Sequence, residues 1–293
     1  LAVETRIQVA TVQGMVARIL NDDKEKTPSS GDFDCIIIDE AHRGYNLDRD
    51  LSDAELLYRD QNDFISKYKK VIDYFDAVKI GLTATPTLHT KIIFGEPVFT
   101  YSYREAVIDG YLVDYDVPYI IKTKLNQSKI HHDKGEKLAR YNPVTKELLN
   151  PSELEDEVDF EVEDFNKKVL TPSFNEEVLK KLSEYIDPEG EEKTLIFAVN
   201  DRHADDIVRY LRDIYKNQDV PFDAIKKITC SIGDKTRVQN AIKLFKNEHY
   251  PTIVVTVDLL STGVDVPEVT KIVFMRRVKS RTLYEQMIGR ATR

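Results

Sequence analysis

Short runs of β-branched and aliphatic residues, separated by stretches with helical periodicity, constrain the fold of this chain more than any other feature. Several runs are apolar on consecutive positions, which is typical of parallel strands covered on both faces. Between them, apolar residues recur at the three- and four-residue spacing of amphipathic helices. We therefore predict an α/β fold built on parallel sheets, with functional residues at the carboxyl ends of strands. The predicted strands are residues 7–11, 33–38, 77–82, 193–199, 226–230, 252–257 and 271–275.

The alternation of strands and helices stops in the middle of the chain, which predicts two lobes joined by an inserted segment. The stretch from Glu153 to Asp164 contains eight acids and no base. Such a run of like charge favours a solvated face over a ligand site. We expect a first α/β lobe over residues 1–122, a linker or insert over 123–172 and a second α/β lobe over 173–293.

Charge and composition narrow the classes of protein that this chain can belong to. The net charge of −9 argues against a uniformly basic surface, but residues 271–293 carry seven Lys or Arg and a single acid. One basic face on a mixed surface is compatible with binding DNA phosphates. No apolar run approaches the ~20 residues that span a bilayer. The two cysteines, Cys35 and Cys230, lack CxxC spacing, so we expect them to be small buried side chains of a cytoplasmic protein.

Two adjacent carboxylates, Asp39 and Glu40, end the apolar strand in the stretch CIIIDEAHRGY. A carboxylate at a strand end can hold Mg²⁺, which prefers hard oxygen ligands and keeps several waters. A second carboxylate can orient or deprotonate the water that attacks a γ-phosphate. Taken alone, DEAH is also compatible with a charged turn at a strand end.

Two further segments follow predicted strands and carry groups suited to phosphate chemistry. GLTATP places Thr83 and Thr85 where they could relay hydrogen bonds, although by itself it is a threonine-rich turn. In the stretch VVTVDLLSTGVDVPEV, Gly263 allows close backbone approach and Asp265 can hydrogen-bond phosphate or ribose.

The C-terminal stretch QMIGRATR has helical character and places Gln286, Arg290 and Arg293 on one predicted helical face. An arginine aimed at a γ-phosphate accelerates its transfer by ~10³ to 10⁵ where this has been measured. Taken alone, two arginines in a basic segment are also compatible with a solvated face.

In this order and at the ends of strands, DEAH, TAT, STGVD and QxxGRxxR resemble the superfamily 2 helicases and translocases. The resemblance covers nearly the whole chain. It implies a tandem helicase core of two RecA-like parallel-sheet lobes that bind ATP and Mg²⁺, with nucleic acid running across both. The flanking stretches IFGEPVFTYSYREAVIDGYLVDY and SRTLYEQMIGRATR are similar to a narrower group, the motor or restriction subunits of type I restriction–modification enzymes.

The resemblance implies roles at the ATP site by position. Asp39 corresponds to the Mg²⁺ partner and Glu40 to the residue that activates water. Arg290 and Arg293 correspond to phosphate-sensing arginines, with Arg293 the better candidate for an arginine finger. The other implied residues are His42, Thr83 and Thr85, which couple the nucleotide state to lobe movement, Gly263 and Asp265, which contact the nucleotide, and Gln286, which assists the arginines.

The resemblance also implies contacts with the DNA backbone. VATVQG lies where these motors carry a backbone-contacting motif, which suggests Thr11 and Gln13 in the first lobe. Asn200, Arg202 and Thr256 are the corresponding candidates in the second lobe. Such contacts fix a protein on the duplex without reading its sequence.

Two elements of the family are missing from this sequence. It contains neither a GxxxxGK[ST] phosphate loop nor the PD…ExK pattern of the family's nuclease domain. Both lie upstream in these motors, so we expect the first lobe to be N-terminally truncated.

The function implied is ATP-dependent translocation of double-stranded DNA, coupled in the longer protein to cleavage by the upstream nuclease. The implied partners are the methyltransferase and specificity subunits of the restriction complex. The alternatives are another superfamily 2 helicase, acting in DNA repair or on RNA, and an inactive fragment or scaffold.

Overall fold

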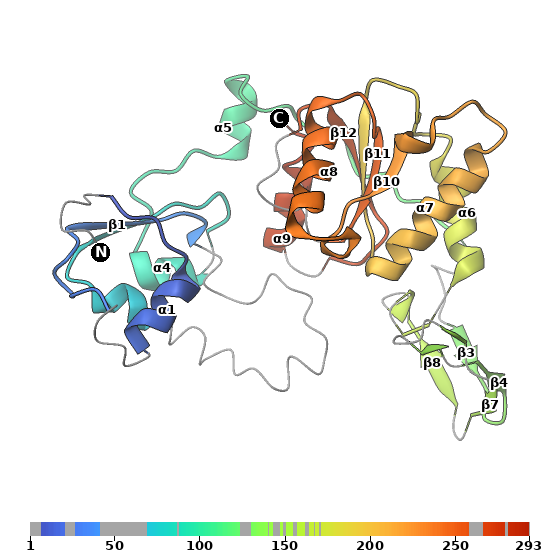
Figure 1. Cartoon of the computed structure of the whole chain (residues 1–293), viewed down its shortest axis with the longest axis horizontal. Coiled ribbons are helices and arrows are strands. Elements are labelled where there is room, and N and C mark those ends of the chain that lie inside the picture. Colours follow the sequence, from blue (N-terminus) through green and yellow to red (C-terminus); the bar gives the residue numbers. More distant parts are fainter. Residues whose placement is uncertain are drawn as a thin grey trace. The chain divides into compact units, whose positions relative to one another are not determined.

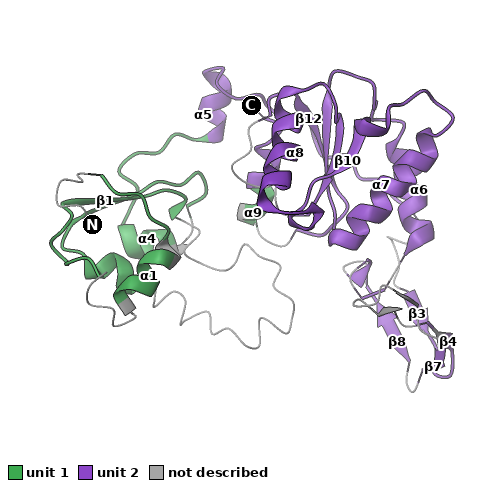
Figure 2. Ribbon diagram, in the orientation of Figure 1, with its two compact units in different colours: residues 1–102, 280–285 green, residues 103–279, 286–293 purple. Residues whose placement is uncertain are grey.

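The protein is organised into two compact units, residues 1–102 with 280–285 and residues 103–279 with 286–293 (Figure 2). The division at residue 103 lies earlier than the predicted boundary at residue 122, because α5 (Tyr103–Ile108) groups with the second unit. The computed structural model describes residues 7–20, 27–41, 69–86, 88–123, 130–139, 141–142, 147–148, 151–154, 157–161, 164–166, 168–169, 171–257, 266–278 and 281–292.

A parallel sheet forms the centre of the second unit, in the strand order β10-β11-β9-β12 (Figure 1). Every residue of β9 and of β11 is buried, as expected for apolar runs covered on both faces. All four strands are parallel, so their carboxyl ends lie at the same edge of the sheet. The strands are β9 (Lys193–Phe197), β10 (Ile225–Lys227), β11 (Ile253–Thr256) and β12 (Val269–Phe274).

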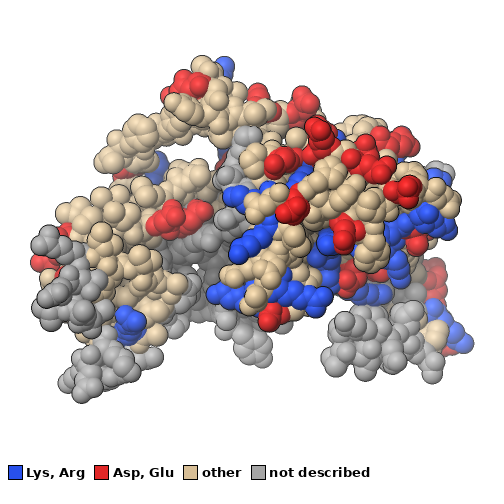
Figure 3. Space-filling view, turned by 45° about the horizontal axis from the view of Figure 1, so that its top comes forward, with Lys and Arg blue, Asp and Glu red and all other residues tan. Residues whose placement is uncertain are grey.

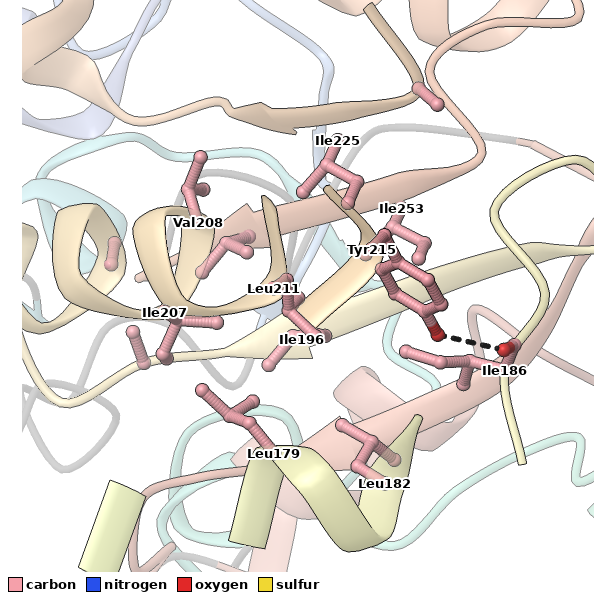
Figure 4. Packing of buried hydrophobic residues seen from close by; sticks show 14 residues of the cluster. Leu179, Leu182, Ile186, Ile196, Ile207, Val208, Leu211, Tyr215, Ile225 and Ile253 are labelled. Atoms are coloured by element: carbon pink, nitrogen blue, oxygen red, sulfur yellow. Dashed lines mark hydrogen bonds between the residues drawn. The ribbon is translucent and has the colours of Figure 1, made fainter. Parts of the chain in front are cut away.

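Amphipathic helices and the sheet they cover together form the apolar core of this unit (Figure 4). In α7 (Asp201–Tyr215), Ile207 and Leu211 are four residues apart and fully buried, so one helical face packs on the sheet. The Tyr215 hydroxyl ends this stripe by donating to the carbonyl of Ile186 at 3.0 Å. The other helical segments are α6 (Pro172–Leu182), α8 (Lys235–Asn247), α9 (Arg281–Ile288) and the 3₁₀ turns Phe222–Ala224 and Cys230–Ile232.

The first unit contains a two-stranded parallel sheet of β1 (Cys35–Ile38) and β2 (Val78–Gly81). Its burial alternates along each strand, and the side chain of Ile37 is 65% exposed. We expected the strands of the sheets to be covered on both faces, and for β1 and β2, as the structure describes them, this expectation is wrong. The helices of this unit are α1 (Val12–Leu20) and α4 (Leu88–Phe94).

Two local expectations from the sequence are not met. Residues 7–11 form no strand; they lead into α1, where the Thr11 hydroxyl accepts a hydrogen bond from the backbone of Gly14 at 3.1 Å. Cys35 and Cys230 are exposed and not buried, because Cys35 lies on the open face of β1 and Cys230 begins a surface 3₁₀ turn.

The predicted linker contains short antiparallel strand pairs. In one pair, the imidazole of His131 lies opposite Asp159, with 2.6 Å between Nδ1 and the carboxylate, so part of the acidic run pairs with histidine. None of the helices in the described ranges is long and apolar enough to cross a membrane. The strands are β3 (Ile130–His132), β4 (Lys137–Leu138), β5 (Tyr141–Asn142), β6 (Glu147–Leu148), β7 (Ser152–Glu153) and β8 (Val158–Phe160).

Candidate functional site

The pairing of β1 with β2 brings two of the predicted motifs together at one sheet edge. Ile38 pairs with Gly81 in the parallel register, so the residues that follow each strand emerge side by side. Backbone hydrogen bonds continue past the strands, from Leu82 N to Ile38 O and from Ala41 N to Leu82 O, both at 2.9 Å. Asp39 and Glu40 are thus held next to the GLTATP turn.

Glu40 has an unusual backbone conformation at this edge. Its φ of 51° lies in the left-handed region, which few residues other than glycine adopt. Its backbone N–H donates to the Asp39 carboxylate at 2.8 Å. Conformations of this kind cost about 1–3 kcal/mol and cluster at functional sites. Asp39 is exposed and Glu40 half-buried, so both carboxylates lie at the surface of the unit.

The two threonines of the GLTATP turn form a local hydrogen-bonded pair. The backbone N–H of Thr85 donates to the Thr83 hydroxyl at 3.1 Å. Thr85 is only 8% exposed, and its own hydroxyl has no hydrogen-bond partner within the described ranges. A buried hydroxyl without a partner is uncommon in folded proteins, so this turn retains hydrogen-bonding capacity next to the two carboxylates.

The predicted arginine helix ends earlier than the sequence indicated. α9 ends at Ile288, and Arg290 lies in the turn that follows. The prediction that Gln286 and Arg290 share one continuous helix is therefore wrong, in keeping with the poor helix propensity of Gly289. In the turn, Arg290 N donates to Met287 O at 3.2 Å. Arg293 lies outside the described residues, as do His42, Gly263 and Asp265.

The predicted DNA-contacting residues of the second unit lie at the carboxyl edge of its sheet. Some of their side chains already interact with other residues of the protein. The Asn200 side chain accepts from His203 N at 2.9 Å, which caps α7, and donates to Asn166 O at 2.8 Å. Thr256 is fully buried. Arg202 is half-buried, with its Nε 3.9 Å from the Asp206 carboxylate. Contact of these residues with DNA remains a prediction.

Comparison with known proteins shows which proteins this chain resembles. The chain is 51% identical to the type I restriction enzyme EcoKI endonuclease subunit of Escherichia coli K12, over 99% of this chain and 25% of that protein. The chain is a relative of the type I restriction endonuclease subunits. It is also 29% identical to the EcoAI endonuclease subunit of Escherichia coli, over 89% of this chain and 30% of that protein.

Family matches and a solved structure agree with this relationship. Residues 177–293 match the helicase conserved C-terminal domain, and residues 2–88 match the res subunit of type III restriction enzymes. A fragment assigned to an HsdR subunit of a type I restriction enzyme from Vibrio vulnificus YJ016 superposes with a TM-score of 0.56 at 22% identity, over 96% of this chain and 43% of that one. The fold is therefore that of the RecA-like helicase lobes. The chain spans about a quarter to a third of the two curated relatives.

The residues at the β1–β2 edge fit the Mg²⁺ that this relationship implies. Asp39, Glu40 and Thr83 offer only oxygen atoms, the donors that Mg²⁺ prefers. The described ranges contain no cluster of three or more His, Cys, Asp or Glu placed to hold a metal ion. A single protein carboxylate suits Mg²⁺ bound mainly through water and substrate phosphates.

Sequence reasoning missed a polar cluster at the start of α7. The Asp201 carboxylate accepts hydrogen bonds from Thr229 at 2.6 Å and from Ser231, and pairs with Lys227 at 3.0 Å. Burial pushes the pKa of Asp201 upward, but these hydrogen bonds and the lysine outweigh it and hold the pKa below its ordinary value. The sequence signal was weak, because the residues come from two segments about 30 positions apart.

Basic side chains of the second unit are interspersed with acids on the face shown in Figure 3. The surface is therefore mixed and not uniformly basic, as the net charge predicted. Arg276 and Arg277 lie two and three residues after the end of β12, at the carboxyl edge of the sheet, and Arg276 donates to Val257 O at 3.4 Å.

Proposed function

We propose that this chain is the motor portion of a type I restriction endonuclease subunit, and that it drives ATP-dependent translocation along double-stranded DNA. In the longer protein this movement is coupled to DNA cleavage by a nuclease domain upstream. The observation that carries the proposal is the β1–β2 register, which puts Asp39 and Glu40 beside Thr83. The 51% identity to the EcoKI endonuclease subunit supports it.

The chain's own residues have distinct tasks in ATP hydrolysis under this proposal. Asp39 holds Mg²⁺, which supplies positive charge that neutralises the phosphates. Glu40 orients the attacking water and accepts its proton. Thr83 and Thr85 couple the nucleotide state to lobe movement by changing their hydrogen bonds as the nucleotide changes.

Arginines stabilise the charge that develops on the γ-phosphate. We assign this task to Arg293 and Arg290, assisted by Gln286, by analogy with other phosphoryl-transfer enzymes. His42, Gly263 and Asp265 complete the proposed nucleotide site. These assignments rest on the resemblance of the motifs.

The proposed DNA track combines backbone-contacting residues with the basic segment at residues 271–293. It comprises Thr11, which is exposed, together with Gln13, Asn200, Arg202 and Thr256. Phosphate contacts of this kind supply affinity without sequence specificity. Recognition of a DNA sequence would then come from the specificity subunit, with the methyltransferase subunit as the second partner.

Hydrolysis of ATP by the full-length protein, with and without duplex DNA, tests the proposal. Glu40→Gln keeps the size of the side chain and removes its basicity, so we expect DNA-stimulated turnover to be lost while nucleotide still binds. Glu96→Gln is the matched control, because it removes only an exposed ion pair with Lys91 in the same unit. Normal turnover by Glu40→Gln would remove Glu40 from its assigned role.

A second assay separates translocation on duplex DNA from strand separation. A translocase displaces a third strand bound in a triplex and leaves the duplex intact. Unwinding of a forked duplex without triplex displacement would instead favour another type of superfamily 2 helicase. Failure in both assays, together with absent ATP turnover, would favour an inactive scaffold.

A further inference from the structure

A hydrogen-bonded relay joins α5 to the turn that carries Arg290. The Tyr103 hydroxyl donates to the carbonyl of Val113 at 2.8 Å, and the Asp114 carboxylate lies 3.3 Å away from it. The backbone N–H of Val113 in turn donates to the carbonyl of Thr292 at 3.0 Å. The Tyr103 side chain, at the start of α5, is thus connected to the arginine turn through the backbone of one residue, Val113.

The segment between Tyr103 and Val113 is a closed turn and not a loose connection. After α5, the backbone N–H groups of Tyr111 and Leu112 both donate to Ala106 O, at 2.9 and 3.1 Å. Gly110 makes this return possible, since its φ of 77° lies in the region that favours glycine. The Tyr103 hydroxyl closes the turn across ten residues, which fixes the direction in which Val113 presents its N–H.

The arginine turn is held from both sides. On the helix side, Arg290 N and Ala291 N donate to carbonyls of the last turn of α9. On the other side, Val113 holds the carbonyl of Thr292, a residue that is 2% exposed. Arg290 lies between these two anchors, and Arg293 follows the second one directly.

We propose that Tyr103 is a positioning residue for ATP hydrolysis, which acts by fixing the turn that carries Arg290 and directly precedes Arg293 in the sequence. The inference rests on the proposed role of these arginines. In this role Tyr103 acts through the backbone of the turn and not directly on the phosphates or the attacking water. It narrows the range of backbone positions from which the guanidinium groups reach the γ-phosphate, and so contributes to orientation, which governs the rate of such reactions.

The environment of Tyr103 keeps its hydroxyl in the form that the relay needs. Burial and then the negative charge of Asp114 raise the pKa of Tyr103 above its ordinary value. The phenol therefore stays protonated and remains a donor across the physiological range. The ring also contacts the ring of Tyr115, with 5.8 Å between centroids, and a phenylalanine would preserve that contact.

The test is Tyr103→Phe in the full-length protein, measured as steady-state ATP hydrolysis with saturating duplex DNA. Loss of one hydrogen bond of about 1 kcal/mol corresponds to about a fivefold fall in kcat, and we expect KM for ATP to stay unchanged. Tyr111→Phe is the matched control: it belongs to the same turn, its side chain is 76% exposed, and its backbone bond to Ala106 survives the substitution.

A double-mutant cycle with Arg290→Ala and Arg293→Ala distinguishes positioning from general stabilisation. If Tyr103 acts through the arginines, Tyr103→Phe has little further effect once both arginines are gone. An unchanged kcat, an equal loss in Tyr111→Phe, or additive losses in the cycle would overturn the inference. Turnover that survives both Glu40→Gln and the loss of the arginines would instead overturn the proposed function.

Discussion

Lowering the pH from 7.5 to 5 should destabilise the second unit through His203. This side chain lies on α7, is 2% exposed, and accepts a hydrogen bond at Nδ1 from Val199 N at 3.2 Å. Its Nε2 has no partner within the described ranges. Protonation of Nδ1 would remove its hydrogen bond from Val199 N. It would also add a second N–H donor without a partner to the core, beside the one at Nε2. Burial accordingly lowers the pKa of His203 to about 4.

The magnitude follows from linkage between proton binding and folding. An unfolded histidine has a pKa of about 6.5, so between pH 6.5 and 4 the unfolded chain binds a proton at His203 that the folded chain does not. The contribution to stability is fully present above about pH 6.5 and is lost as the pH falls toward 4. The loss amounts to about 2 kcal/mol at pH 5 and about 3 kcal/mol below pH 4.

Urea denaturation at pH 7.5 and 5.0 measures this loss. The chain contains no tryptophan, so circular dichroism is the suitable probe. His203→Gln retains a side chain that can accept from Val199 and does not titrate, and we expect the wild-type protein to lose about 2 kcal/mol more than this variant. His249→Gln, at an exposed position, should behave as wild type. An equal loss in wild type and His203→Gln would contradict the reasoning.

Asn175→Ala should lower the free energy of unfolding by about 2–4 kcal/mol, because it breaks a reciprocal pair of 2.8 Å hydrogen bonds with the buried amide of Asn166. Chemical denaturation measures this loss. A loss no larger than that of the control Asn217→Ala, at an exposed position, would contradict the prediction. Gly81→Ala brings a methyl group to 3.0 Å from the Phe94 ring of α4 and should lower the free energy of unfolding by about 1–3 kcal/mol. In the control Gly31→Ala the added methyl group meets nothing within 4 Å, so the same denaturation experiment should show almost no change. DNA affinity of the full-length protein should fall linearly with salt on a logarithmic scale, and a flat salt response would exclude the proposed phosphate track.

Local pattern was sufficient to locate the strands that carry the motifs. Consecutive apolar residues predicted β1, β2, β9 and β11 to within one or two residues. A polar residue directly after such a run lies at a strand end in almost any α/β arrangement, so Asp39, Glu40 and Thr83 could be singled out without a structure. The resemblance to the restriction motors rested on the same local stretches together with their order.

Helix ends and side-chain partners were predicted less well. The sequence extended α9 through Arg290, although the helix ends before Gly289. It also did not show that the Asn200 side chain caps α7 and donates to the carbonyl of Asn166, a residue 34 positions away. The end of α9 is a local effect of Gly289, whereas the contact of Asn200 with Asn166 depends on a neighbour that the local pattern does not contain.

By itself, the sequence determined the α/β class, the positions of β1, β2, β9 and β11 and the kinds of chemical group at their ends, because periodicity and residue type act over a few neighbouring positions. Only the tertiary structure decided that Ile38 pairs with Gly81, and that Tyr103 reaches the arginine turn through Val113. The strand register and the hydrogen bonds of Tyr103 and Val113 both join segments that are far apart in the sequence. Backbone N–H and C=O groups can pair with any other backbone group, so the packing of the whole unit decides which groups become partners.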